Sequence, residues 1–230
     1  FKGHIVFPTS AFDQVLAAKE DAVILGGVKA LNRGMACFCE VDPRMYGAAY
    51  IPFNFGEEVS LKYLRDAIKN NFSVILIDTI APEGCKAFTH PDYDIVWQEI
   101  QDSDITITLH VGADSGWDPV PLSFYNNASS VPTHKEGDAP RDALAYMGIS
   151  YNAELFLASM IFDGVLERFP NLRIGVVELG ASWIISWMKH LDQSFRAFRR
   201  IQDLSHVKKL PSEYVLKHIK ITPFPGEDIG

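Results

Sequence analysis

The residues best suited to chemistry stand at the ends of two short apolar segments. Residues 105–109 are Ile-Thr-Ile-Thr-Leu, and His110 follows them directly. A second apolar segment, at residues 172–177, is followed by Glu178. Side chains that follow buried strands lie at the mouth of the sheet, where α/β barrels bind metals and substrates. Because neighbouring parallel strands end on the same side, the sequence predicts that His110 and Glu178 converge on one ligand.

His110 is the predicted metal ligand. A neutral imidazole on a rigid strand suits Zn²⁺ or a similar divalent ion that keeps one position open for water. Such an ion would lower the pKa of that water and polarise a substrate carbonyl or carboxylate. Glu178 is predicted to act as a general base, to orient a water molecule, or to bind the metal, either as a ligand itself or through a hydrogen bond to a ligand. The alternatives are a hydrogen-bonded core histidine for His110 and an ion pair with Arg or Lys for Glu178.

A long polar, aromatic and Gly/Pro-rich segment runs over residues 113–148. Loops of this length inside a domain usually have a function, so this one is predicted to be a lid over the mouth. The alternative is an oligomer contact or an ordered surface loop. Asp114 is its predicted catalytic residue, and its aromatic and polar side chains are of the kind that small-molecule pockets use. The predicted substrate-binding residues are Trp117, Tyr125 and Asn126, together with Trp183 near the mouth.

The other histidines are expected to have structural roles. His90 stands before Pro91 and Asp92, and it is expected to cap the helix that follows. Three further histidines, on helix faces or at a strand start, are given no chemistry: His190, His206 and His218.

Strand and helix patterns alternate along the chain. Six alternations require parallel strands with right-handed crossovers, and strands that are apolar on both faces indicate a sheet covered by helices. The predicted strands cover residues 4–8, 47–53, 72–78, 105–112, 172–180 and 218–223. The predicted helices cover residues 15–40, stretches that begin near 56 and near 92, then 152–169 and 182–201.

Two α/β architectures fit this alternation, an eight-stranded barrel and an open doubly wound sheet. The open sheet usually has a Gly-rich phosphate loop after its first strand. Residues 8–11 here are Pro-Thr-Ser-Ala, without a glycine. Nucleotide binding is therefore disfavoured, and both architectures remain open on the pattern alone.

Composition narrows the classes of partner. The 230 residues are 47% hydrophobic, enough for one barrel domain over residues 1–230, and the net charge of −8 argues against nucleic acid. The basic pairs at 199–200 and 208–209 are expected to be solvated. No apolar run reaches the roughly 20 residues of a bilayer span, so no membrane partner is expected. The three cysteines are expected to be reduced thiols in a cytoplasmic protein. A homo-oligomer is possible, because barrel enzymes often associate through their helices and lids.

Five segments along the chain carry a resemblance to a known family. They are FCEVDPR (38–44), THPDYDIVW (89–97), LHVG (109–112), LERFPNLR (166–173) and ELGASW (178–183). In this order they resemble the amidohydrolase superfamily, in the branch that contains aminocarboxymuconate-semialdehyde decarboxylase and related metal-dependent hydrolases and decarboxylases. The resemblance covers nearly the whole chain and implies a (β/α)₈ TIM barrel as the fold, with one divalent metal at its C-terminal mouth.

Two metal-binding features of the family do not occur in this sequence. The family has a His-x-His pair on its first strand and a metal-binding Asp at the end of its eighth. Here His4 is followed two residues later by Val6, and Asp228 stands at the expected start of a helix after strand seven. We therefore expect about six of the eight barrel strands in this chain, and a biological chain that is longer.

The predicted function is metal-dependent hydrolysis or non-oxidative decarboxylation of a small carboxylated or cyclic organic substrate. Residues 72–79 contain no lysine, which binuclear relatives use to bridge two metals, so one divalent ion is expected. Zn²⁺ is favoured, with Mn²⁺ as the second choice. Glu178 replaces a histidine that related decarboxylases often have. The alternative is a catalytically silent barrel that binds a ligand or partner after losing its metal ligands.

Overall fold

Six parallel strands form one sheet, in the order in which they follow along the chain. The structure is a computed structural model, which describes residues 2–8, 10–111, 124 and 142–228. The sheet order is β1-β2-β3-β4-β5-β6, as in part of a barrel wall. The strands are β1 (His4–Val6), β2 (Met45–Ile51), β3 (Val74–Ile77), β4 (Thr106–His110), β5 (Arg173–Val177) and β6 (Ile219–Ile221).

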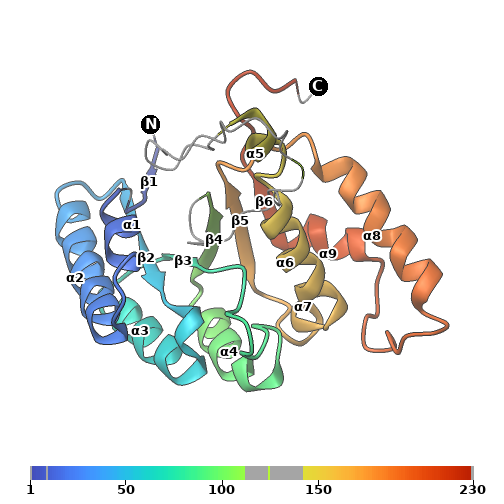
Figure 1. The fold of residues 1–230 in the computed structure, drawn as a ribbon, viewed down its shortest axis with the longest axis horizontal. Helices are drawn as coiled ribbons and strands as arrows, with labels where there is room; N and C mark the ends of the chain where they lie inside the picture. Colours follow the sequence, from blue (N-terminus) through green and yellow to red (C-terminus); the bar gives the residue numbers. More distant parts are fainter. Residues whose placement is uncertain (1, 9, 112–123, 125–141, 229–230) are drawn as a thin grey trace.

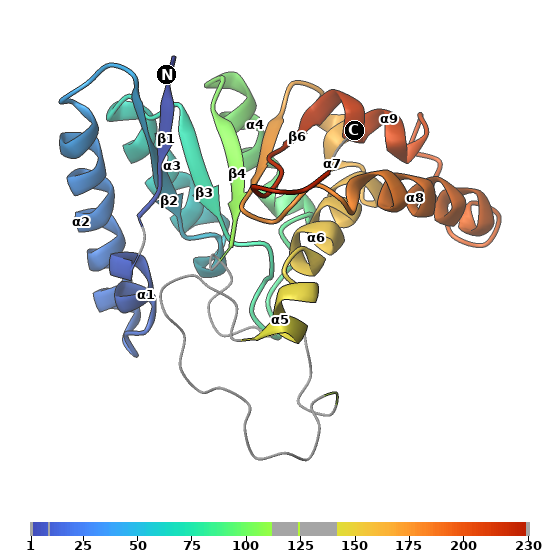
Figure 2. The ribbon, with the colours of Figure 1, turned by 90° about the horizontal axis from the view of Figure 1, so that it is seen from above.

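Helices line the outer side of the sheet. Figure 1 shows the strands as an arc, with α2, α3, α4, α6 and α9 around it. Figure 2 shows α1 and α5 beside the edge at which the strands finish. The helices are α1 (Ser10–Leu16), α2 (Asp21–Cys39), α3 (Glu57–Lys69), α4 (Asp94–Asp102), α5 (Ala143–Met147), α6 (Tyr151–Phe162), α7 (Val165–Arg168), α8 (Ile184–Phe198) and α9 (Pro211–His218), with 3₁₀ turns η1 (Phe53–Phe55) and η2 (Pro91–Tyr93).

Two predicted helices are wrong as single elements. The helix predicted over residues 15–40 divides into α1 and α2, which pack so closely that a Cβ on Gly27 would lie 2.6 Å from a methyl of Val15. The helix predicted over residues 152–169 is interrupted at Gly164, whose φ of 74° is left-handed and favours glycine. All six predicted strands are confirmed, with ends that differ by a few residues, whereas the short helices α5 and α9 were not predicted.

The core lies between the convex face of the sheet and the helices. Side chains alternate between the two faces of a strand, and the outward ones at Ile75, Ile77, Ile107 and Leu109 are fully buried. Trp97 of α4 is also fully buried, and its indole N–H donates to the Phe88 carbonyl. Polar side chains of the strands can therefore project only from the other, concave face, which forms the inner wall of the arc.

By length and composition alone, α2 could cross a membrane. It has 19 residues with a mean hydropathy of 1.2, and it lies near the N-terminus of the chain. Core helices of soluble proteins and signal sequences share this length and composition. The sequence prediction that no run is long enough thus has one borderline exception.

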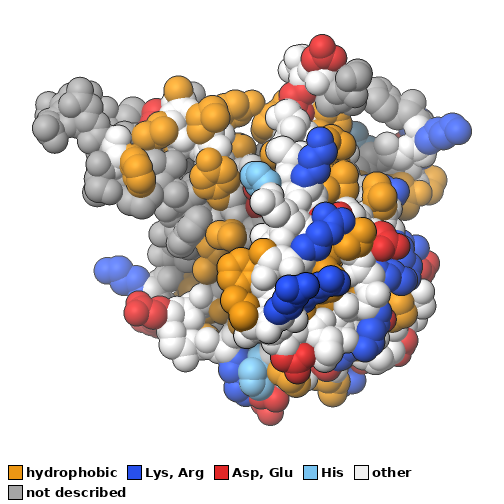
Figure 3. Space-filling model, turned by 90° about the vertical axis from the view of Figure 1, so that its right-hand side faces the viewer, with side chains coloured by type: hydrophobic (Ala, Val, Ile, Leu, Met, Phe, Trp, Pro, Cys, Tyr) orange, Lys and Arg blue, Asp and Glu red, His pale blue; other side chains and the backbone are white. Residues whose placement is uncertain are grey.

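Basic side chains gather on the face that α8 and α9 present. Figure 3 shows Lys and Arg as a band across this face of the molecule. Arg199, Arg200, Lys208 and Lys209 are all exposed, which confirms the expectation that these pairs are solvated.

His218 is a buried histidine at the end of α9. It is 3% exposed, and its Nδ1–H donates to the Leu172 carbonyl at 2.8 Å. Its Nε2 has no hydrogen-bond partner among the residues that the structure describes. Burial lowers the pKa of His218 below its ordinary value of 6.5, and this effect outweighs the opposing effect of the hydrogen bond. The fold therefore favours the neutral imidazole.

This burial predicts a pH dependence of stability. A depressed pKa means that the unfolded chain binds more protons below pH 6.5, so the free energy of unfolding falls as the pH is lowered from about 6.5 towards the folded pKa. His218→Gln keeps a donor for Leu172 and removes the titration, so the loss of Tm between pH 7 and pH 5 should shrink. Differential scanning calorimetry checks this, with the exposed His190→Gln as control. An equal loss in wild type and His218→Gln would contradict the prediction.

Candidate functional site

His110 is the last residue of β4 and its ring is nine-tenths buried. Its side chain is 8% exposed, and Nδ1 lies 2.7 Å from the Val111 carbonyl oxygen. Because a carbonyl can only accept, Nδ1 carries a proton, and in the neutral imidazole the lone pair is then on Nε2. The Phe7 ring packs against the imidazole with centroids 4.3 Å apart. The ring is thus held in one tautomer and one orientation, as metal-binding histidines are.

Glu178 meets His110 at the mouth of the sheet. β4 and β5 are in register, with His110 opposite Val177, so Glu178 begins the turn that follows. Its Oε2 lies 3.3 Å from the His110 Nε2, and its side chain is 57% exposed. The backbone φ of Glu178 is 55°, an uncommon value for a residue with a side chain. The structure therefore brings the two residues together as predicted, and their roles remain predictions.

The two facing atoms are both hydrogen-bond acceptors in this tautomer. Neither can satisfy the other unless a proton or a cation lies between them. A neutral imidazole nitrogen and a carboxylate oxygen are ligands that Zn²⁺ and Mn²⁺ accept. No group of three or more His, Cys, Asp or Glu that could hold a metal occurs among the described residues. His110 and Glu178 thus fit a divalent ion, which needs further ligands beyond these two.

The turn after Glu178 is tied to the C-terminal segment of the chain. Gly180 has a φ of 69°, and a Cβ there would lie 2.9 Å from the Glu227 Oε1. The Glu227 carboxylate accepts from the N–H groups of Ala181 and Phe224, at 2.9 and 2.8 Å. Burial acts to raise the pKa of Glu227, but these backbone donors outweigh it and lower the pKa. Residues 225–226 form a turn, and the described residues end at 228, so the helix expected to start at Asp228 stays a prediction.

Trp183 supports the same turn. Its indole N–H donates to the carbonyl oxygens of Leu179 and Gly180, at 3.1 and 2.9 Å, and its ring contacts Trp187 edge to face. The N–H is therefore already used, and only the ring is left for the predicted contact with a substrate. The other predicted residues, Asp114, Trp117, Tyr125 and Asn126, lie outside the described residues, as does most of the predicted lid.

Asp78 is a functional candidate that the sequence analysis missed. It follows β3 directly and is 1% exposed. The Tyr50 hydroxyl donates to its two carboxylate oxygens at 2.8 and 2.9 Å, and the Asn54 N–H lies 3.4 Å away. Leu76 pairs with Thr108, so Asp78 and His110 each stand two residues beyond the same pair, on the same face. The sequence does contain a signal for Asp78, which is a polar residue directly after a buried apolar run. The same pattern identified His110.

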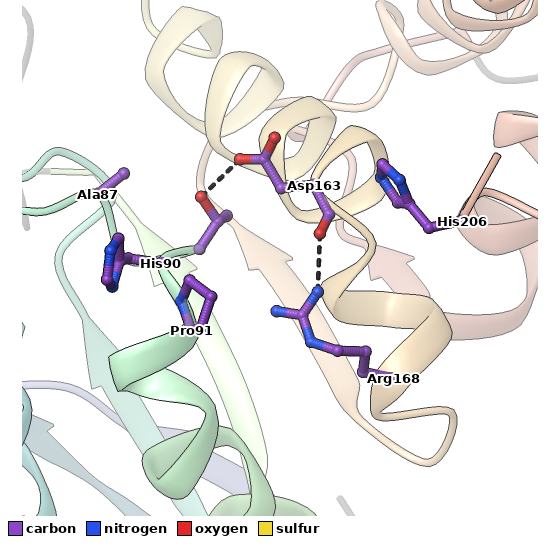
Figure 4. Close-up of a pocket in the computed structure, with 7 residues that line it drawn as sticks. Ala87, His90, Pro91, Asp163, Arg168 and His206 are labelled. Carbon is purple, nitrogen blue, oxygen red and sulfur yellow. Dashed lines mark hydrogen bonds between the residues drawn. The ribbon is translucent and has the colours of Figure 1, made fainter. Parts of the chain in front are cut away.

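A shallow pocket of about 510 Å³ lies elsewhere, on the outer wall between η2 and the α6–α7 junction (Figure 4). Its polar groups bond to each other and to the backbone. The Thr89 hydroxyl donates to Asp163, Arg168 pairs with Asp94, and the His206 ring contacts the Phe162 carbonyl. These contacts are typical of a structural junction, and we assign the pocket no chemistry. At its edge, the His90 ring accepts from the Asp92 N–H and caps η2, which confirms that expectation.

Several solved structures have a fold similar to that of this chain. No protein-family model matches the sequence, and no curated protein does. An amidohydrolase from Mycobacterium avium subsp. paratuberculosis K-10 is similar at a TM-score of 0.78 and 17% identity, over 99% of this chain and 56% of that one. The 5-carboxyvanillate decarboxylase of Sphingomonas paucimobilis is similar at a TM-score of 0.69 and 18% identity, over 96% and 60%.

A third solved structure contains a metal. The 5-carboxyvanillate decarboxylase of Novosphingobium aromaticivorans DSM 12444, complexed with manganese and 4-hydroxy-3-methoxy-5-nitrobenzoic acid, has a TM-score of 0.71 and 19% identity, over 97% of this chain and 59% of that one. The chain thus spans less than two thirds of the length of these structures. At such identities the likeness shows the fold, which is that of part of a (β/α)₈ barrel, as predicted.

The Tyr50–Asp78 contact gives a prediction about stability. Tyr50→Phe removes the hydroxyl that donates to a buried carboxylate, and this should lower the free energy of unfolding by about 1–3 kcal/mol. Urea unfolding at pH 7 measures it as a lower midpoint at unchanged slope. The exposed Tyr146→Phe is the control, with an effect within about 0.5 kcal/mol. An unchanged midpoint for Tyr50→Phe would mean that the hydroxyl contributes nothing.

Proposed function

We propose that this chain is the larger part of a metal-dependent hydrolase or non-oxidative decarboxylase of the amidohydrolase superfamily. The observation that carries the proposal is the meeting of the His110 Nε2 with the Glu178 carboxylate at the ends of adjacent barrel strands. Active sites of barrel enzymes lie at this edge. The sequence resemblance and the similarity to an amidohydrolase and to decarboxylases agree with this assignment.

The proposed cofactor is one divalent metal ion, held by the His110 Nε2 with Glu178 as a second ligand or as the base beside it. A bound divalent ion would supply Lewis-acid polarisation of a substrate carbonyl or carboxylate. The sequence analysis favoured Zn²⁺, whereas similar structures are described with manganese, so Mn²⁺ stands beside Zn²⁺ as a candidate.

The residues of the chain have separate tasks in this proposal. The Val111 carbonyl holds the proton on Nδ1 and so keeps the Nε2 of His110 free to bind a metal. Phe7 covers the imidazole and keeps water from one side of it. Glu178, which is more than half exposed at the mouth, can take a proton from water or deliver one to the substrate.

The substrate class is proposed as a small carboxylated or cyclic organic molecule. Hydrolysis would release an acid from an ester, lactone or amide, whereas decarboxylation would replace CO₂ by a proton on carbon. Assays of CO₂ release and of acid release with matched substrates separate the two reactions. A catalytically silent barrel, the alternative, predicts neither product and no bound metal.

Metal content tests the proposal. Purified wild-type chain, loaded with Mn²⁺ or Zn²⁺ and desalted, should hold about one ion per chain by inductively coupled plasma mass spectrometry. His110→Ala removes the predicted ligand and should lower metal affinity by tenfold or more. The control is His190→Ala on the exposed side of α8. Equal metal content in wild type and His110→Ala would remove His110 from the site.

A further variant separates the two roles of Glu178. Glu178→Gln retains the shape and loses the charge, so a direct ligand would weaken metal binding about tenfold. A residue that acts only as a base would leave metal content unchanged and lower turnover.

A further inference from the structure

Lys220 lies on the concave face of the sheet, together with His110. In β6, Ile219 pairs with Ile174 and Ile221 pairs with Val176. Ile174 and Val176 are at most 1% exposed, since they face the helices. Lys220 pairs with Gly175, and because side chains alternate, it projects from the opposite face.

The register gives the place of Lys220 relative to the candidate site. Lys220, Gly175 and Thr108 lie side by side across β6, β5 and β4, and His110 stands two residues beyond Thr108 on the same face. Lys220 is therefore two strands away from His110 and two residues further from the mouth of the sheet. Neighbouring strands lie about 4.8 Å apart and rows on one face about 6.7 Å apart. A flexible four-carbon stem can cover much of that separation.

The strand between them leaves the path open. Gly175 has no side chain, and the nearest atoms to a Cβ built there are a methyl of Thr108 at 3.7 Å and the Ile107 carbonyl at 3.8 Å. These are ordinary contact distances, so neither a close approach nor a left-handed φ requires glycine at this position. Its effect is to leave space on the inner wall between Lys220 and the row of His110.

Lys220 is exposed and forms no ion pair or hydrogen bond with any residue that the structure describes. The other cation on this face, Arg173, is tied to Asp104 at the opposite end of the sheet, at 2.8 Å. Arg44, Arg65 and Arg168 also form ion pairs with carboxylates. An ammonium group without an ion-pair partner, on the wall of a candidate active site, can bind an anion.

We propose that Lys220 binds a carboxylate of the substrate and so selects carboxylated molecules at this site, an inference that rests on the proposed function. The Glu178 carboxylate lies at the mouth, 3.3 Å from the His110 Nε2, whereas Lys220 places a positive charge one row deeper on the same wall. The ammonium attracts the carboxylate towards β6 and orients the rest of the molecule towards His110. Lys220 is thus a specificity-determining residue.

A different role for Lys220 has to be separated from this one. β6 is an edge strand of the described sheet, and inward-pointing lysines on edge strands prevent strands of two molecules from pairing. That role needs the charge but no ligand. Loss of the charge would then cause self-association and would leave ligand binding unchanged.

Benzoate and benzamide, which have similar shapes and different charge, test the proposal. The full-length protein should bind benzoate more tightly than benzamide by isothermal titration calorimetry. Lys220→Met should weaken benzoate binding by about tenfold or more, which is the size of a charge-assisted hydrogen bond, and leave benzamide binding unchanged. Lys220→Arg should retain most of the preference. Lys217→Met on α9, which removes the same charge from an exposed position, is the matched control.

Two results would overturn the proposal. One is benzoate binding in Lys220→Met equal to that of wild type, with or without increased self-association by light scattering. The other is a wild-type chain with no preference for benzoate. Metal content of the same samples separates this inference from the proposed function: a chain that holds no metal but loses its benzoate preference in Lys220→Met supports Lys220 and contradicts the metal site.

Discussion

The alternation of side chains across a parallel, helix-covered sheet is the constraint on which the site depends. Helices cover the convex face, so every outward position must be apolar, and Ile75, Ile107 and Val176 are fully buried there. Polar side chains can project only from the concave face. A shift of one residue in register would exchange the two sets and bury the polar one. The hydrophobic core thus determines which residues can form the site.

The mouth of the sheet depends on a second feature, the strained turn after β5. Glu178 has a left-handed φ, which costs free energy in a residue with a side chain. The turn is held by Trp183, whose N–H bonds to Gly180, and by Glu227, whose carboxylate accepts from Ala181. The Glu227 hydrogen bonds also anchor the C-terminal segment to this turn. The strained turn is thereby supported by one local contact and by one that is far away in the sequence.

Much of the fold could be predicted from the sequence, and the reasons are local. β-branched runs bounded by polar residues predicted all six strands, including those that end at His110 and Glu178. Helix interruptions were harder, because the break at Gly164 depends on a backbone conformation and not on hydrophobic pattern. Asp78 and Lys220 were missed for a different reason. Asp78 follows a buried run as His110 does, but only the register places the two on the same face. The position of Lys220 likewise depends on register across strands, which a single strand pattern does not contain.

The central claim is that His110 binds a divalent metal through the nitrogen that faces Glu178. Pulsed electron paramagnetic resonance of Mn²⁺ added to chain with ¹⁵N-labelled histidine tests it most directly. The account predicts a bound ion with the hyperfine coupling of one directly ligated imidazole nitrogen, lost in His110→Gln. Bound Mn²⁺ without that coupling, or with the same coupling in His110→Gln, would contradict it.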